Sequence, residues 1–224
     1  MTEIDRDTIK CVLMGTEDAV IQHRFVERYS DQLEQFLDHM AIAFTEWRNL
    51  DAQISKDVPG AHVSAFIYGA FHPHVVAMKL LISGLLVPAG NSQRYVLESL
   101  AAALLFSKPA LGFLQRHIDN QYSPSKAVRD VRKYADDLNL SLNRTSLDML
   151  ERQSKLYSKA SHPTMFSFAS FITHDGEKSV HVLGGCFDPG KEFVYNKEIA
   201  SRVSLASIFP NIVQGVRRNY CGAA

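Results

Sequence analysis

Six polar residues on two predicted helices have the side-chain types needed to bind an anion or to transfer a proton. They are Arg94, Glu98, Tyr157, Lys159, Ser161 and His162. The first two lie four residues apart in an apolar segment, so they share one helix face and can form an ion pair. The other four follow one another within two turns, and the imidazole lies at the negative end of the helix dipole.

Two interpretations of these six residues remain open. In the first, they form a buried polar network that ties two helices together, because a charge buried alone would cost several kcal/mol. In the second, they line a shallow anion or nucleotide pocket, with Arg94 and Lys159 as charge partners and His162 as acid or base. We favour the network and expect no catalytic residue among them.

The segment 88–163 is predicted to form four consecutive helices that position this cluster. Its first helix, about 91–107, is apolar on nearly every side, which is typical of a central helix. Its last helix begins at Thr145-Ser-Leu-Asp148, a sequence similar to a capping box, and ends before His162-Pro163. The cluster therefore joins the central helix to the end of the 145–161 helix.

The pair Arg94-x-x-x-Glu98, followed some sixty residues later by Tyr157-Ser-x-x-Ser161-His162-Pro163, resembles uncharacterised bacterial helical proteins. That group is distantly similar to the HEPN (higher eukaryotes and prokaryotes nucleotide-binding) superfamily. The resemblance covers roughly residues 60–165. It implies an all-helical bundle, in some members with ribonuclease or nucleotide-binding activity, often encoded near bacterial defence or toxin loci.

The active HEPN pattern, an Arg followed by four to six residues and then a His, is missing from this sequence. Arg116 directly precedes His117, and Arg152 precedes His162 by ten residues. An active ribonuclease is therefore disfavoured. If the chain is related to this superfamily, its active site is expected to be degenerate.

Residues 16–56 are predicted to form one long helix with a heptad pattern. Apolar side chains recur at alternating intervals of three and four at Val26, Tyr29, Leu33, Phe36, Met40, Ala43, Trp47, Leu50 and Ile54. Such a seam packs either against a second copy or against other helices of the same chain. The sequence therefore leaves open a homodimer through this helix and a long bundle in a monomer.

A second apolar helix is expected from about Val63, with His72-Pro73-His74 inside it. Proline there predicts a kink or a division of the helix. The His-x-His pair could be part of a metal site, but no adjacent residue supplies the further ligands that a metal requires. A further helix is predicted over 123–138. One face of it carries four basic residues, Lys126, Arg129, Arg132 and Lys133. A basic face can bind phosphates, but acidic residues are interleaved here, so we favour a solvated face with ion pairs.

Beyond Pro163 the hydrophobic period changes to two, which predicts a three-stranded antiparallel meander over 165–173, 179–187 and 192–196. A final helix is expected over about 197–220. In this part of the chain His162, His174, His181 and Asp175 form a second weak metal candidate, and we expect no bound metal or cofactor. The expected domains are a helical bundle over 1–163 and the meander with its helix, 164–224, packed on that bundle as one compact unit.

Composition excludes several classes of protein. Lys and Arg together number 24, as do Asp and Glu, so no global charge attracts nucleic acid or an anionic membrane. No P-loop, dinucleotide-binding or hydrolase fingerprint occurs. The odd number of cysteines (Cys11, Cys186 and Cys221), the polar N-terminus and the absence of an uninterrupted apolar run of about 20 residues favour a cytoplasmic protein without a membrane span.

The sequence thus predicts a mainly helical protein of uncharacterised function, most consistent with a non-enzymatic binding or regulatory module. It would act through a protein partner or as a homodimer. The alternative is a HEPN-like enzyme acting on nucleic acid or nucleotides through a degenerate site.

Overall fold

The computed structural model describes residues 6–15, 18–138, 144–160, 162–175 and 178–222. The protein is mainly helical, as predicted. The helices are α1 (Arg6–Met14), α2 (Asp18–Ile54), α3 (Val58–Ile82), α4 (Leu86–Phe106), α5 (Phe113–Ile118), α6 (Ala127–Lys133), α7 (Arg144–Ala160), α8 (Met165–Ser170) and α9 (Glu192–Cys221). Strands β1 (Ile172–Asp175) and β2 (Lys178–His181) form an antiparallel pair.

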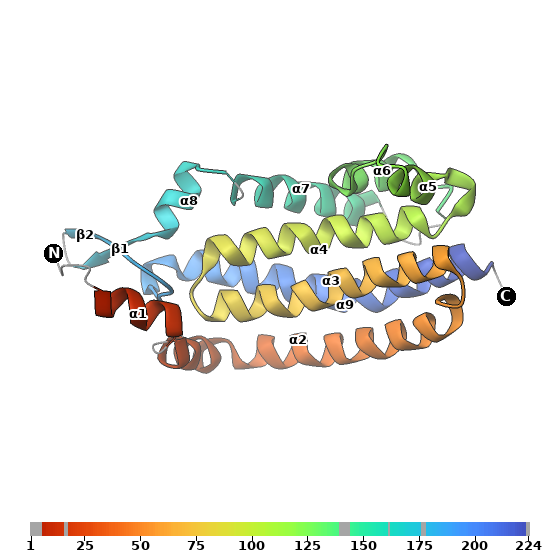
Figure 1. The fold of residues 1–224 in the computed structure, drawn as a ribbon. Helices are drawn as coiled ribbons and strands as arrows, with labels where there is room; N and C mark the ends of the chain where they lie inside the picture. The colour runs from red at the N-terminus through yellow and green to blue at the C-terminus, as the bar shows by residue number, and fades with distance from the viewer. Residues whose placement is uncertain (1–5, 16–17, 139–143, 161, 176–177, 223–224) are drawn as a thin grey trace.

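Four long helices run side by side and form the body of the molecule (Figure 1). α2 packs on α9 and α3, and α3 packs on α4, which in turn carries α6 and α7 on its other side. α4 is the most completely buried of these helices, since every residue from Ser99 to Phe106 is buried. The predicted central helix is therefore the central helix of the bundle. α1, α8 and the two strands lie together at the end of the bundle opposite the C-terminus.

The heptad seam of α2 faces the interior of the same chain. Phe36, Met40, Ala43 and Leu50 are buried in the core shared with α3 and α9. At the start of the seam the register differs from the prediction, because Phe25 is buried and Val26 is 45% exposed. The backbone of Tyr29 is non-helical, with φ −127° and ψ 27°, and this kink rotates the first turns relative to the rest.

α3 is one continuous helix, although Pro73 lies inside it. Proline removes one backbone hydrogen bond, but packing on α2, α4 and α9 holds the helix on both sides of it. The helix starts at Asp57, whose carboxylate accepts a hydrogen bond from Gly60 N at 2.7 Å. Among the described residues α3 alone is long and apolar enough to cross a membrane, and a third of its most apolar window is buried within the protein.

The predicted three-stranded meander is not confirmed, because only β1 and β2 pair within the described residues. Residues 165–170 form α8 instead, which starts with a capping box between Thr164 and Ser167. Residues 192–196 form the first turns of α9, where Glu192 complements the helix dipole. The alternation of apolar residues in these runs is short, and the residues that favour the start of a helix determined the structure instead.

Candidate functional site

A buried polar cluster lies where α3, α4, α7 and α9 meet, and it begins at His74. The imidazole of His74 is fully buried among the apolar side chains of the core. Its Nδ1 lies 3.0 Å from Oε1 of Gln93 on α4, and its Nε2 lies 3.2 Å from the backbone carbonyl of Arg202 on α9. One side chain therefore links three helices.

The contacts of His74 fix its tautomer. A carbonyl oxygen can only accept, so Nε2 carries the proton and donates to Arg202 O. In the neutral ring Nδ1 is then an acceptor and needs a donor. With the amide oxygen of Gln93 facing Nδ1, the amide nitrogen of Gln93 is buried without a hydrogen-bond partner among the described residues. Exchanging the two amide atoms lets the amide nitrogen of Gln93 donate to Nδ1, and we assign that orientation.

Arg202 and Glu198 form an ion pair inside the bundle. Arg202 is 0% exposed, and its Nη1 lies 2.6 Å from Oε2 of Glu198. The guanidinium also donates to the carbonyls of Glu198, at 2.9 Å, and of Ala89 on α4, at 3.1 Å. Burying such a charge is costly unless it is paired and hydrogen-bonded, and these three acceptors compensate the Nη atoms. Nε of Arg202 is buried without a hydrogen-bond partner among the described residues.

Tyr157 brings α7 into the cluster. Its hydroxyl donates to Oε2 of Glu198 at 3.2 Å and lies 3.4 Å from Oγ of Ser201. Burial raises the pKa of this phenol, so it stays a neutral donor. Glu198 therefore accepts hydrogen bonds from Arg202 on its own helix and from Tyr157 on α7.

His74 is neutral in this environment. Burial lowers its pKa to about 4, and the positive charge of Arg202 lowers it in the same direction. An imidazole with that pKa and no exposed surface cannot exchange protons with a substrate in solvent at pH 7. The contacts that the cluster makes are hydrogen bonds and an ion pair among its own buried polar groups.

The structure places the six predicted residues as follows. Arg94 and Glu98 form an ion pair on α4, with Nε and Oε1 2.8 Å apart and both side chains partly exposed. Tyr157 lies in the buried cluster, whereas His162 is exposed. The side chain of Lys159 and the whole of Ser161 lie outside the described part of the structure.

The residues at the centre of this cluster, His74, Glu198 and Arg202, were not among the six predicted from the sequence. Glu198 and Arg202 have the same four-residue spacing as Arg94 and Glu98, and they lie on the apolar stripe of α9 with Tyr195, Leu205 and Phe209. Charged residues at positions where the helical pattern places core residues therefore indicate a buried ion pair. His74 gave a weaker one, since it lies in an apolar helix beside a proline.

The metal candidates do not form a site in the described part of the chain, where no group of three or more ligand side chains is suitably placed. His74 is committed to Gln93 and Arg202, while His72 is exposed. His162 and His181 are both exposed, and the side chains of His174 and Asp175 lie outside the described set.

The basic residues of α6 are partly engaged in ion pairs. Arg132 bridges to Asp148 and Glu151 on α7, at 3.0 and 2.8 Å. Arg129 contacts Asp130, whose carboxylate also accepts the hydroxyl of Tyr122. Two of the four basic residues, Arg129 and Arg132, are therefore ion-paired, while Lys126 and Lys133 are exposed.

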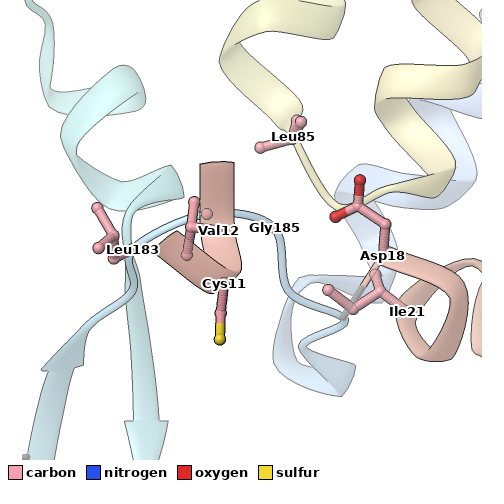
Figure 2. A pocket seen from close by; sticks show the side chains of 8 residues that line it. Cys11, Val12, Asp18, Ile21, Leu85, Leu183 and Gly185 are labelled. Carbon is pink, nitrogen blue, oxygen red and sulfur yellow. The ribbon is translucent and has the colours of Figure 1, made fainter. Parts of the chain in front are cut away.

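A small pocket lies at the end of the bundle that carries α1 (Figure 2). Its volume is about 90 Å³. Val12 lines it from α1, Ile21 from α2, Leu85 from the turn before α4, and Gly185 from the segment after β2. Pockets for cofactors and drug-sized ligands are several times larger, so this one is too small for a ligand of that size.

Comparison with protein-family models, with curated proteins and with solved structures finds no match to this chain.

Proposed function

We propose that the protein is a non-enzymatic helical binding or regulatory module that acts through a protein partner or a second copy of itself. One observation carries the proposal: the charged and titratable side chains that converge in the bundle are sealed. His74 and Arg202 are both 0% exposed, and a catalytic acid or base has to reach its substrate. The cluster serves to lock four helices in one arrangement.

Exposed apolar side chains support a surface function. Leu13 of α1 is 79% exposed, and Met165 and Phe168 of α8 are 83% and 52% exposed. α1 has no buried residue, and it lies at the same end of the molecule as α8 (Figure 1). Single exposed apolar residues are ordinary, but groups of them indicate contact surfaces.

The homodimer through residues 16–56 stays a prediction. The seam on which it rested is already covered by α3 and α9, so pairing through α2 would have to use its outer, charged face. We also infer a cytoplasmic location, supported by the three widely separated cysteines in the sequence.

The alternative function is a HEPN-like enzyme with a degenerate site. Its support is the partly exposed Arg94–Glu98 pair on α4 together with the exposed imidazole of His162. We expect purified protein to leave single-stranded and structured RNA intact, and Arg94→Ala and His162→Ala to behave identically. His23→Ala, a change to an exposed histidine of α2, is the matched control.

RNA cleavage by the wild type and by His23→Ala, but not by His162→Ala, would contradict the binding-module proposal. It would assign catalysis to the partly exposed residues instead. Gel electrophoresis of end-labelled RNA after incubation with each variant provides the readout.

A further inference from the structure

The outer face of α3 carries an exposed stripe with heptad spacing that no described element covers. We define the α3 stripe as Ala61, Ala65, Tyr68, His72, Val75 and Lys79. The intervals between these residues alternate between four and three, and all six are exposed. At about 1.5 Å per residue the stripe runs for about 27 Å along the helix. Figure 1 shows α3 unobstructed on the side facing the viewer.

The stripe changes in side-chain size along its length. The small side chains of Ala61 and Ala65 lie before Tyr68, and the larger His72, Val75 and Lys79 lie after it. Val58, in the first turn of α3 and 67% exposed, extends the stripe at its N-terminal end. A reversed copy centred at Ala70 sets the two alanines against larger side chains, Ala61 against Lys79 and Ala65 against Val75, and such pairs can interdigitate.

Aromatic contacts hold the middle of the stripe in place. The ring of Tyr68 lies 4.8 Å from that of Trp47 on α2 and 6.3 Å, stacked, from that of His72. Trp47 is fixed in turn by its hydrogen bond to Oγ of Ser64, at 3.1 Å. A preordered side chain loses little conformational entropy on binding, so Tyr68 is suited to be an anchor.

The stripe is flanked by further exposed rings. Phe44 of α2 is 37% exposed and packs on Phe71, with ring centroids 5.2 Å apart. Tyr95 of α4 is 55% exposed and lies beside Gly69 of α3. Its hydroxyl oxygen is 3.8 Å from the position that a Cβ atom on Gly69 would occupy. Both rings extend the apolar surface beyond α3 itself.

Charge distinguishes this face from its neighbours. α2 carries seven acidic and three basic residues, and residues 108–160 carry ten basic and six acidic ones. The stripe has no charge before Lys79. The stripe residues before Lys79 therefore bring no like charges together when two copies pair.

We propose that the α3 stripe is the surface through which two copies of this chain pair, with their α3 helices antiparallel. Centred at the level of Ala70, this arrangement sets Ala65 against Val75 and Tyr68 against His72 of the second copy. Lys79 then lies over the first turns of the opposite α3, near the carboxylate of Asp57. The interface is isologous, as a two-fold dimer requires.

Sedimentation equilibrium of the full chain between about 1 and 100 µM tests the dimer. We expect a wild-type dimer that Ala65→Glu weakens by more than about 100-fold, because each interface would bury two unpaired carboxylates. Ala200→Glu, the same change at an exposed alanine on the outer face of α9, should leave the dimer intact. Circular dichroism checks that both variants keep their helices. A wild type that stays monomeric throughout overturns the proposal.

Disulfide trapping tests the antiparallel geometry. In a chain with its native cysteines changed to serine, Ala65→Cys combined with Val75→Cys should give a covalent dimer on mild oxidation. Ala65→Cys alone should not, because the two positions 65 lie about 15 Å apart along the pair. Crosslinking by the single variant, or none by the double variant, contradicts this geometry.

Binding to lipid is the competing outcome, since α3 is also the most apolar long helix. Flotation with phosphatidylcholine vesicles, lost in Ala65→Glu while the wild type is monomeric in solution, would assign the stripe to a membrane surface instead. The dimer proposal rests on the proposed function and specifies the partner as a second copy of the chain. A monomeric wild type would contradict the dimer but not the binding module. RNA cleavage would contradict the binding module but not the dimer.

Discussion

At the scale of single residues, the ion pair between Glu198 and Arg202 is the interaction on which the cluster depends. Arg202 has no access to water, so its charge is compensated only by Glu198 and by two backbone carbonyls. Removing one partner of a buried pair leaves an uncompensated charge, which costs far more than removing both.

Glu198→Gln should therefore lower the free energy of unfolding by about 3–5 kcal/mol. The double change Glu198→Leu with Arg202→Met should cost markedly less, because it removes both charges. Glu34→Gln, at an exposed glutamate of α2, should change stability by less than about 0.5 kcal/mol. Chemical denaturation measures all three, and a loss below about 1 kcal/mol for Glu198→Gln would show that the pair is solvated.

The histidines on either side of Pro73 differ in burial and should differ in their effect on pH dependence. In the folded protein the pKa of His74 is lowered to about 4, below the ordinary value of 6.5. Between these values the unfolded chain binds a proton that the folded chain does not, so stability falls as pH falls from about 6.5 to about 4. At 1.36 kcal/mol per pKa unit the loss is on the order of 3 kcal/mol.

Unfolding free energies measured at intervals from pH 7 to pH 4 check this. His74→Gln should flatten the dependence, and His72→Gln, at the exposed neighbour, should leave it as in the wild type. Identical pH profiles for His74→Gln and the wild type would contradict the assignment of that slope to His74.

At the scale of elements, the turn between α3 and α4 is locked against the segment that follows β2. Gly84 has φ +74°, and a Cβ there would lie 2.3 Å from the carbonyl oxygen of Cys186. A Cβ on Gly185 would lie 1.8 Å from the carbonyl oxygen of Ser83. The two backbones thus approach more closely than any side chain would permit, and glycine is required on both sides.

Gly84→Ala should destabilise the protein by more than Gly112→Ala does, by at least about 1 kcal/mol. Gly112 shares the left-handed conformation, with φ +64°, but has no described atom within 4 Å of its Cβ position. Its substitution therefore costs only the conformational penalty of about 1–2 kcal/mol. Thermal unfolding compares the two variants, and equal losses would mean that the contact with Cys186 is not tight.

At the scale of the whole molecule, helical periodicity was enough to predict the bundle but not the register of every seam. The spacing from Leu33 to Ile54 placed the buried face of α2 correctly. At the start of α2 Phe25 is buried in place of Val26, close to the non-helical backbone of Tyr29, and a local backbone distortion cannot be recognised from hydrophobic spacing. The predicted third strand is wrong because Asp188 caps a 3-10 turn over Pro189–Lys191 that leads directly into α9, and Glu192 lies in the first turn of that helix.

The candidate cluster was predicted only through Tyr157. Sequence spacing identifies pairs on one helix, such as Arg94 with Glu98, but does not show which helices meet. The contact of α9 with α3 and α4 joins Arg202 to His74 and Ala89, which are more than a hundred residues away in the sequence. Such long-range contacts are set by the packing of the whole bundle.

Nuclear magnetic resonance of the histidine side chains tests most directly whether the bundle is sealed around this cluster. Long-range proton–nitrogen spectra of the full chain, recorded from pH 8 to pH 4, report the tautomer and the titration of each imidazole. The structure predicts that His74 is a neutral Nε2–H tautomer that stays neutral until about pH 4. A His74 that titrates near pH 6.5, as an imidazole in contact with water does, would show that the cluster opens to solvent and would contradict the account.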